Sequence, residues 1–363
     1  MASQRSQNSQ GSNESNKSVA QSQPLSTRAA SFMQHKYHQI HLFQKPNNHG
    51  VLLEQNGFPE VAHALIDVLN NHFLNTALTK IREDVPSTYL MQFWLSANVE
   101  EIDNHGVCIT GYASHRDAEQ IALLSFNKAK LRAALSLPSK RDLNLLGYSE
   151  NPTDEEICEF VNFLGYNQPL SSRTQFRRGR LPPLWNTLFS ILNRALTCKT
   201  GSPDQSSHQI LAIMYGIYYD LPLNYAGLIF EEMVNAVKAK VKEQTGSKKT
   251  KKEGKNPKNL SYPRFFSILF GDDLFGEAET KGKPFPKDGL PAKINRMKSH
   301  SPTLHSEGYS FRRPLSLGML NYLSESEREL YIRGYQTPEP EPATPPTRRS
   351  QVRRQSDIYA RRF

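Results

Sequence analysis

The side chains that could do chemistry in this sequence are few. Glu155, Glu156 and Glu159 lie close together in the sequence, and carboxylates are suited to general acid–base catalysis. They fall in the first turn of an expected helix, where the helix dipole favours acidic side chains without any catalytic role. No nucleophile or partner base accompanies them in the sequence. We therefore predict no catalytic residue and expect that the protein is not an enzyme, with a cleft assembled from residues distant in the sequence as the alternative.

Potential metal ligands are present, but their spacing is unsuitable. His35, His38 and His41 recur every three residues, yet neither a fourth ligand nor a carboxylate lies nearby in the sequence. The chain has three cysteines, Cys108, Cys158 and Cys198. They are too far apart for a zinc knuckle or a disulfide framework, and we expect them to be small buried apolar residues. The sequence therefore predicts neither a metal site nor a cofactor.

Basic side chains carry the main functional signal. The formal net charge of +10 indicates an anionic partner, of which nucleic acid is the commonest and a membrane surface a weaker alternative. Residues 238–258 are lysine-rich and almost free of large apolar side chains, so we expect a solvated loop. The candidates for phosphate contact or nuclear import are Lys248, Lys249, Lys251, Lys252, Lys255, Lys258, Arg348, Arg349, Arg353 and Arg354. Because no aromatic residue interleaves the lysines, any binding should be independent of sequence.

Composition also limits where the protein can act. The hydrophobic content of 37% is low for a fully folded chain of 363 residues, so part of the chain should be a solvated tail. No run of about 18 apolar residues could span a bilayer, and the polar N-terminus lacks the apolar stretch of a secretion signal. We expect a nuclear or cytoplasmic protein with nucleic acid as its partner, possible self-association, and neither a membrane nor a small-molecule ligand.

A helical hairpin between residues 176 and 219 should form the centre of the core that positions these segments. Pro182 and Pro183 suit the first turn of a helix, where a missing N–H costs nothing. The apolar residues that follow occupy more than one helix face, so Trp185 is expected to be a buried core anchor rather than a base-stacking surface residue. Asp204 and Ser206 are the expected caps of the second helix.

Other helices are predicted from their capping residues. Thr153 and Glu156 form a capping box in sequence. A further helix should open at Pro59, with His63 and His72 beside its apolar stripe as surface or boundary residues. The remaining expected caps are Ser87, Asn127 or Ser125, Asn224, Ser261 and Ser324.

One β-hairpin interrupts this helical pattern. Residues 106–113 and 119–126 are two short β-prone runs separated by a turn-like segment. A hairpin followed by a helix is typical of part of a winged-helix module, whose recognition helix would carry Lys128, Lys130 and Arg132. Packing explains the same residues, and we prefer that interpretation.

The predicted fold class is mainly α, a single helical domain with one small β-hairpin between disordered N- and C-terminal segments. Residues 1–35 form a disordered Ser/Gln/Asn-rich tail, and residues 36–271 form the α-rich domain with its basic loop at 238–258. Residues 272–363 form a mostly disordered Pro/Lys/Arg-rich tail with a short helix at 324–333.

An ordered series of sequence blocks runs through the expected domain: QFW, LRAALSLP, LGY, LPPLWNTLFSILNRALTCKTGSPDQ, NYAGLIFEEMV and SYPRFFSIL. Over roughly residues 39–271 this series resembles the putative plant transposon proteins, a family found beside or fused to retrotransposon coding regions. The resemblance implies an element-encoded, gag-like helical domain, and it supplies no catalytic residues.

The sequence lacks the motifs of the enzymes that such elements encode. It has no Asp-Thr-Gly or Asp-Ser-Gly of a retroelement protease, no Tyr-x-Asp-Asp of a reverse transcriptase and no His/Cys zinc module of an integrase. A Cys-Cys-His-Cys knuckle for RNA is also missing, so the basic segments would have to substitute for it. Two hypotheses remain: a transposable-element-derived protein that self-associates or coats nucleic acid, and a domesticated protein-interaction module whose lysines serve nuclear import.

Overall fold

The computed structural model describes residues 48–58, 60–82, 84–114, 121–198, 205–245, 261–275, 291–293, 296–297 and 315–334. Its α-helices are α2 (His63–Asn71), α3 (Asn75–Thr79), α4 (Ser87–Ser96), α5 (Lys128–Ala134), α6 (Asp154–Phe163), α7 (Pro183–Leu196), α8 (His208–Tyr219), α9 (Tyr225–Thr245), α10 (Pro263–Phe275), α11 (Leu317–Leu320) and α12 (Glu325–Gly334). Short 3-10 turns are η2 (Gln55–Gly57), η3 (Glu60–Ala62), η4 (Arg173–Gln175) and η5 (Arg178–Arg180). The mainly α fold class predicted from the sequence is confirmed.

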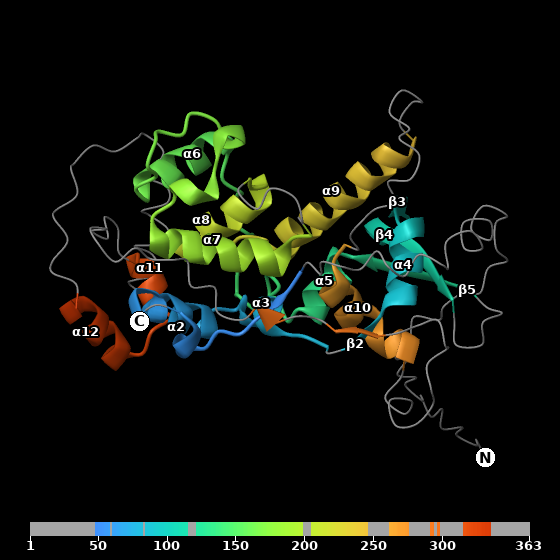
Figure 1. The fold of residues 1–363 in the computed structure, drawn as a ribbon, viewed down its shortest axis with the longest axis horizontal. Helices are drawn as coiled ribbons and strands as arrows, with labels where there is room; N and C mark the ends of the chain where they lie inside the picture. Colours follow the sequence, from blue (N-terminus) through green and yellow to red (C-terminus); the bar gives the residue numbers. More distant parts are fainter. Residues whose placement is uncertain are drawn as a thin grey trace, which may run out of the picture.

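Seven short strands accompany the helices. They are β1 (Gly50–Val51), β2 (Asp84–Pro86), β3 (Asn98–Ile102), β4 (Gly106–Ser114), β5 (Ile121–Asn127), β6 (Pro291–Lys293) and β7 (Arg296–Met297). Strands β3, β4 and β5 form an antiparallel sheet, while β2 pairs antiparallel with β6 and β1 pairs parallel with β7. In Figure 1, α7 and α8 lie at the centre of the helical part, and α9 runs from there toward the sheet, α4, α5 and α10.

The central hairpin has the predicted form. Helix α7 begins at Pro183, and eleven of its residues are buried. Trp185 is only 1% exposed and packs edge-on against Tyr218 of α8, with 5.3 Å between the ring centroids. The expected cap of α8 is wrong, because Ser207 is the N-cap and makes no side-chain capping bond. The Ser206 hydroxyl instead donates to the carbonyl of Ser207 (3.0 Å), and Asp204 lies outside the described residues.

Capping chemistry accounts for several of the other helix starts. Thr153 and Glu156 make the predicted capping box at α6, and Asn127 accepts the backbone N–H of Lys130 at the start of α5. Asn224 likewise accepts the N–H of Gly227 at the start of α9 (3.1 Å). Ser261 was expected to cap α10, but that helix begins at Pro263 after a residue with positive φ, Tyr262.

The predicted hairpin of 106–126 is present as β4 and β5, but it belongs to a three-stranded sheet. Its third strand, β3, reads NVEEI and is largely exposed, so it lacks the apolar alternation that would have revealed it. Helix α4 packs on β4, where Gly111 lies against Phe93 so closely that an added Cβ would come within 2.7 Å of the ring. The sheet is thereby joined to the helical core.

Two further expectations about the chain's basic and C-terminal parts need correction. Helix α9 continues to Thr245, so the first eight residues of the expected loop at 238–258 are helical. The expected tail 272–363 contributes α11 and α12, of which α12 matches the helix predicted at 324–333. Met319 and Leu320 of α11 are buried in the common core.

Polar contacts fix these C-terminal helices on the domain. The Ser316 hydroxyl donates to the carbonyl of Tyr218, and the Tyr322 hydroxyl donates to Asp220 (2.8 Å). Asn71, at the end of α2, donates to the carbonyl of Tyr322 (2.8 Å). Segments that are far apart in the sequence therefore share one packed unit.

His72 is not the surface residue expected from the sequence. It is 1% exposed, and its ring lies 4.0 Å from Phe73 and 4.7 Å from Tyr322 between centroids. Nδ1 accepts the backbone N–H of Leu74 (3.1 Å), whereas the buried Nε2 has no hydrogen-bond partner within the described part of the chain. Burial lowers the pKa of His72 from its ordinary 6.5 to about 3.

We predict that Trp185→Ala lowers the free energy of unfolding by about 3–5 kcal/mol, because it leaves a cavity at the centre of the α7–α8 hairpin. Urea denaturation followed by far-UV circular dichroism measures the change. The matched control is Leu146→Ala, since Leu146 is fully exposed and its loss should change stability by less than about 0.5 kcal/mol. Equal stability of the two variants would contradict the assignment of Trp185 to the core.

We predict that His72 makes the fold acid-sensitive. As the pH falls from 6.5 toward 3, the unfolded chain binds a proton that the buried imidazole does not, so the free energy of unfolding falls by up to about 4 kcal/mol. His72→Asn keeps an acceptor for the Leu74 N–H and removes the titration. Chemical denaturation across this pH range should therefore show a weaker pH dependence for the variant, and identical curves would reject the prediction.

Candidate nucleic-acid interface

The basic residues singled out from the sequence all lie outside the described residues. This holds for Lys248, Lys249, Lys251, Lys252, Lys255, Lys258, Arg348, Arg349, Arg353 and Arg354, and for His35, His38 and His41. The structure does describe residues next to the undescribed segments in the sequence, such as Asn48, Cys198 and Ser261. The geometry of those residues, and the basic side chains around them, define the candidate interface.

Arg264 is the centre of this region. Its side chain is completely buried, and its Nη2 donates to the carbonyls of Ala77 (2.8 Å) and Ala195 (2.7 Å) while Nη1 donates to that of Lys80 (2.8 Å). These acceptors lie at the C-terminal ends of α3 and α7, where helices carry unsatisfied carbonyls and partial negative charge. Burial lowers the pKa of Arg264 to about 9, so the guanidinium stays protonated at neutral pH.

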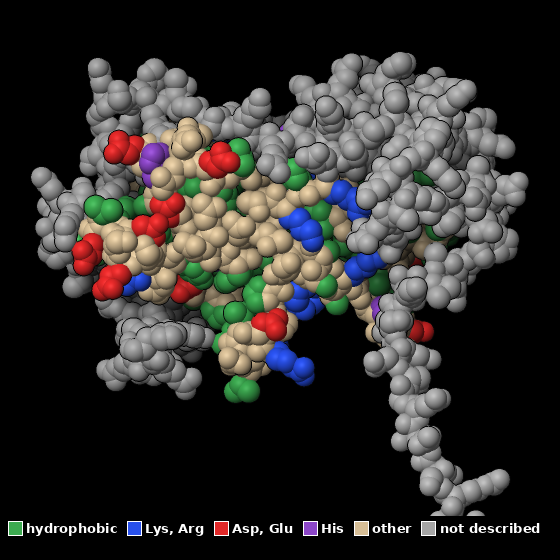
Figure 2. Space-filling view, turned by 90° about the horizontal axis from the view of Figure 1, so that it is seen from below, with side chains coloured by type: hydrophobic (Ala, Val, Ile, Leu, Met, Phe, Trp, Pro, Cys, Tyr) green, Lys and Arg blue, Asp and Glu red, His purple; other side chains and the backbone are tan. Residues whose placement is uncertain are grey.

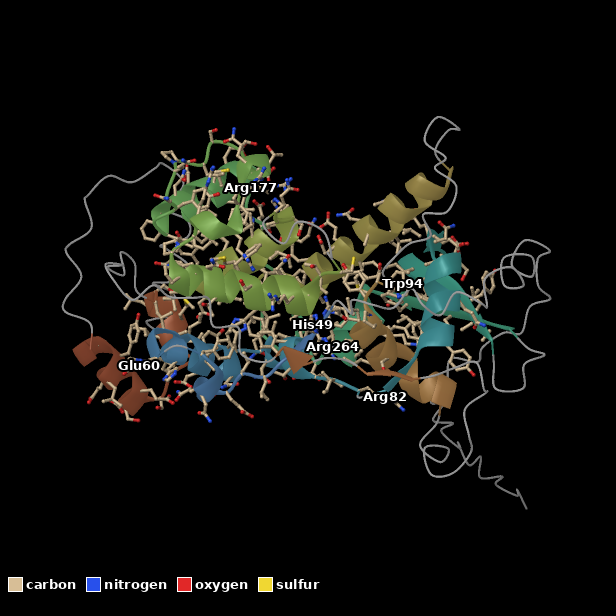
Figure 3. The ribbon with its side chains drawn as sticks, in the orientation of Figure 1. His49, Glu60, Arg82, Trp94, Arg177 and Arg264 are labelled. Atoms are coloured by element: carbon tan, nitrogen blue, oxygen red, sulfur yellow. The ribbon has the colours of Figure 1, made fainter. Side chains whose placement is uncertain are left out.

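The first described residues are bonded to the same helix end. Asn48 donates from Nδ2 to the carbonyl of Ala195, and its Oδ1 accepts the backbone N–H of Phe265 (3.0 Å). The N–H of His49 donates to the carbonyl of Arg194 (3.0 Å). Figure 3 shows His49 and Arg264 close together below α7. The segment that follows residue 47 is therefore anchored at the C-terminal turn of α7 and the start of α10.

Cys198 links the residues that precede α10 to this junction. Burial raises the pKa of its thiol, and the neighbouring side chains of Ser261 and Tyr262 partly offset the rise. Cys198 precedes the undescribed residues 199–204, and Ser261 follows the undescribed lysine-rich residues 246–260. Asn48, Cys198 and Ser261 thus place three ends of the described chain around the C-terminus of α7.

The charge of the described residues differs from that of the whole chain. Acidic side chains slightly outnumber basic ones in the described ranges, so the net charge of +10 comes from the segments outside them. Figure 2 shows acidic side chains at the end of the molecule where α2 and α12 lie, and basic ones nearer the middle of that face. Within the described residues, only local basic sets, and not the net charge, would favour a polyanion.

An arginine-rich turn before α7 is the main basic set that the structure describes. Arg177, Arg178 and Arg180 lie in or next to η5, and Arg194 lies in the last turn of α7. Burial, followed by the nearby charge of Arg178, lowers the pKa of Arg194. Trp185 is buried among apolar residues, so no tryptophan accompanies these arginines as a stacking platform.

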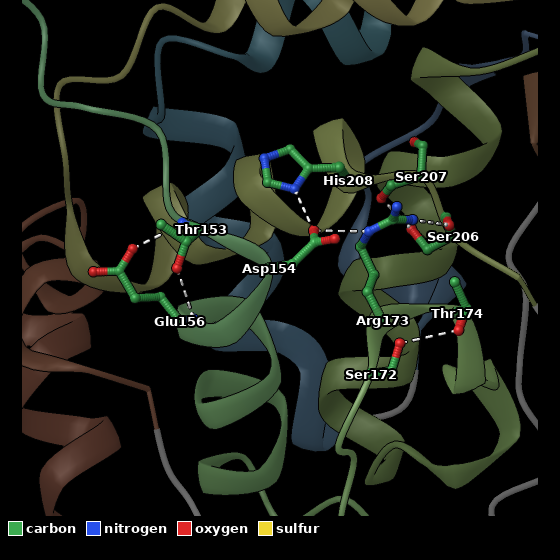
Figure 4. A network of polar contacts seen from close by, with 9 residues as sticks. All are labelled: Thr153, Asp154, Glu156, Ser172, Arg173, Thr174, Ser206, Ser207 and His208. Atoms are coloured by element: carbon green, nitrogen blue, oxygen red, sulfur yellow. Dashed lines mark hydrogen bonds and ion pairs between the residues drawn. The ribbon is translucent and has the colours of Figure 1, made fainter.

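A second polar group joins Asp154, Arg173 and His208 (Figure 4). Asp154 Oδ1 accepts from Arg173 Nε (2.8 Å) and from His208 Nδ1 (2.7 Å). Burial raises the pKa of Asp154, but these two hydrogen bonds and the partners' charges outweigh it and leave the pKa below its ordinary value. The imidazole points away from Ser206 and Ser207, so the group ties the starts of α6 and α8 to η4 without forming a proton relay to a serine nucleophile.

The other chemical candidates have structural roles in the described residues. Glu156 accepts the N–H of Thr153 (2.8 Å) as part of the capping box. Arg132 donates to Asn224 (3.1 Å), and Lys130 lies 4.6 Å from the centre of the Phe270 ring, so these members of the suggested recognition helix contact neighbouring elements. Cys108 and Cys158 are buried, as expected, while Cys198 is partly exposed.

The described ranges lack the features of two kinds of site, metal centres and membrane spans. They contain no set of three or more His, Cys, Asp or Glu side chains arranged to hold a metal ion. Among the helices described, none combines the length and apolar character needed to cross a membrane.

Sequence reasoning missed Arg264 as the central residue of this region. A usable signal was present, because Arg264 is a single charge inside the aromatic run YPRFFSILF. A charged residue in such a run must find partners, and the nearest unsatisfied groups in a helical core are the carbonyls at helix C-termini.

No family model, no curated protein and no solved structure matches this chain. The resemblance to the putative plant transposon proteins therefore remains a prediction supported by the sequence blocks alone.

Proposed function

We propose that this protein is a non-enzymatic, transposable-element-derived, gag-like scaffold that binds nucleic acid without sequence preference through its basic segments. The observation that supports the proposal most directly is the separation of charge. The described residues are together close to neutral, whereas the excess of lysines and arginines lies outside the described ranges. Each basic side chain that contacts a phosphate releases a counterion, which gives affinity without reading bases.

The anchoring of the chain at the C-terminus of α7 supports the same proposal. Asn48, Cys198 and Ser261 are held there, so residues 1–47 end at this place and residues 199–204 and 246–260 each have one of their two ends there. Basic segments that start from a common point act at a high effective concentration toward one ligand. Together they would bind a polyanion more strongly than the same segments would separately.

A second function is favoured by a different observation. Leu317, Leu330 and Ile332 are exposed on α11 and α12, at the acidic end of the domain. Exposed apolar side chains on a docked helical segment suit a protein partner. The alternative is therefore a domesticated protein-interaction module whose lysines serve nuclear import and not nucleic-acid binding.

Salt dependence of binding tests the first function. Fluorescence anisotropy of the full chain with labelled single-stranded DNA and RNA of unrelated sequences, between about 50 and 200 mM salt, should show similar affinities that fall steeply with salt. Changing Lys248, Lys249, Lys251 and Lys252 together to Ala should reduce the slope of log K against log salt by up to about 3 units. Absence of binding at low salt would reject the proposal.

Two controls separate the alternatives. Changing Lys140 and Arg141 to Ala removes two exposed basic residues from the loop after α5 and should leave most of the slope unchanged. A tagged four-lysine variant that loses nuclear import while its nucleic-acid affinity equals that of the unaltered protein would support the interaction module instead.

A further inference from the structure

The strongest concentration of positive charge within the described core lies between α6 and the end of α7. The sequence contains no Asp or Glu between Glu159 and Asp204. The described residues of this stretch carry five arginines, Arg173, Arg177, Arg178, Arg180 and Arg194. Arg173 forms an ion pair with Asp154, and the other four arginines are the basic surface considered below.

The backbone that presents these arginines is held firmly. The Tyr166 hydroxyl accepts the N–H of Arg177 (2.7 Å) and donates to the carbonyl of the same residue (3.2 Å). The Tyr166 ring stacks on the buried Phe176, with 5.8 Å between centroids. The N–H of Asn167 donates to the carbonyl of Arg180 (3.0 Å). Both ends of η5 are thus fixed to the loop after α6, which reduces the entropy that binding would cost.

The side chains are placed to receive an anion. Arg177 is exposed, and its Nη1 donates to the carbonyl of Phe176 (2.8 Å), which orients the guanidinium. Arg180 is half-buried, and its side chain makes no hydrogen bond or ion pair with any residue that the structure describes. Arg178 lies close enough to Arg194 for their charges to repel, and an anion bound beside them would relieve that repulsion.

The kind of anion follows from what surrounds the arginines. Phe176 and Trp185 are buried, so neither of these neighbouring aromatic rings is open for stacking on a base. Arginine guanidinium groups match the geometry of phosphate oxygens and can bind them in a bidentate manner. This surface is therefore suited to the phosphodiester backbone rather than to the bases.

We propose that Arg177, Arg178, Arg180 and Arg194 form a phosphate-binding surface that holds the nucleic-acid backbone against the folded core. The proposal rests on the nucleic-acid function proposed above and assigns it a site within the described residues. Arg194 precedes the anchored residue Cys198 by four positions, so the surface adjoins the junction from which the basic segments leave. A backbone held on the arginines would also be within reach of those segments.

The test uses full-length Arg177→Gln/Arg180→Gln in the anisotropy assay with single-stranded DNA. Loss of two phosphate contacts should lower the slope of log K against log salt by about 1.4 units. Arg177→Lys/Arg180→Lys keeps both charges and should retain most of the slope. Lys140→Gln/Arg141→Gln is the control for a loss of two exposed charges elsewhere, and it should leave the slope nearly unchanged.

Three results would overturn the assignment. If the double Gln variant keeps the slope while the four-lysine variant loses it, the basic segments bind nucleic acid and this surface does not. If the double Lys variant loses as much slope as the double Gln variant, the arginines maintain structure rather than hold phosphate. If the unaltered protein does not bind at low salt, the proposed function and this surface fail together.

Discussion

The buried guanidinium of Arg264 is the interaction on which the arrangement of this protein depends. One side chain satisfies the carbonyls of Ala77, Lys80 and Ala195 and so ties α10 to the C-terminal ends of α3 and α7. A buried charge is costly unless hydrogen bonds and opposite partial charges compensate it. Here the compensation comes from helix ends, whose carbonyls would themselves be costly to bury without donors. The arginine and the helix ends therefore require one another.

Because the guanidinium of Arg264 needs acceptors and the carbonyls at the helix ends need donors, chain segments distant in sequence meet at one place. Asn48 bonds both to Ala195 and to the N–H of Phe265, which follows Arg264 directly. Cys198 lies against Ser261 and Tyr262 just before it. The junction is apolar and aromatic around a single charge, so it supplies rigidity. The arginines proposed to contact phosphate lie beside it, and the lysines of residues 246–260 precede Ser261, which is held at it. In this account the folded core anchors the basic segments, and those segments carry most of the positive charge.

The sequence predicted those parts of the fold that depend on local chemistry. The capping box at Thr153 and the proline start of α7 are local signals, and both are present in the structure. Trp185 was assigned to the core because its helix is apolar on most faces. Features that depend on tertiary contacts were missed. Burial of His72 requires Tyr322, which comes from a segment 250 residues later, and the exposed strand β3 exists because β4 offers it a partner.

The residues of the candidate interface also fall into those that the sequence predicted and those that it did not. Its lysines were found from composition alone, since a charge run needs no fold to be recognised. The proposed arginine surface could not be predicted, because the charges of Arg178 and Arg194 come close enough to interact only when η5 folds against α7. Arg264 left a signal in the sequence, a single charge inside an aromatic run, but its acceptors could not be predicted, because they are carbonyls, which every residue has and which only the fold brings together.

Replacing Arg264 tests the account most directly. Arg264→Met keeps much of the side-chain volume but removes the donor to the carbonyls of Ala77, Lys80 and Ala195, of which, among the described residues, only that of Ala195 keeps a second donor, Asn48. The free energy of unfolding should therefore fall by about 3–5 kcal/mol. Native-state hydrogen exchange should then show faster exchange at the amides of His49 and Phe265, which are bonded at the junction, than at amides in the middle of α8. Unchanged stability together with unchanged exchange at His49 and Phe265 would contradict the claim that Arg264 holds this junction together.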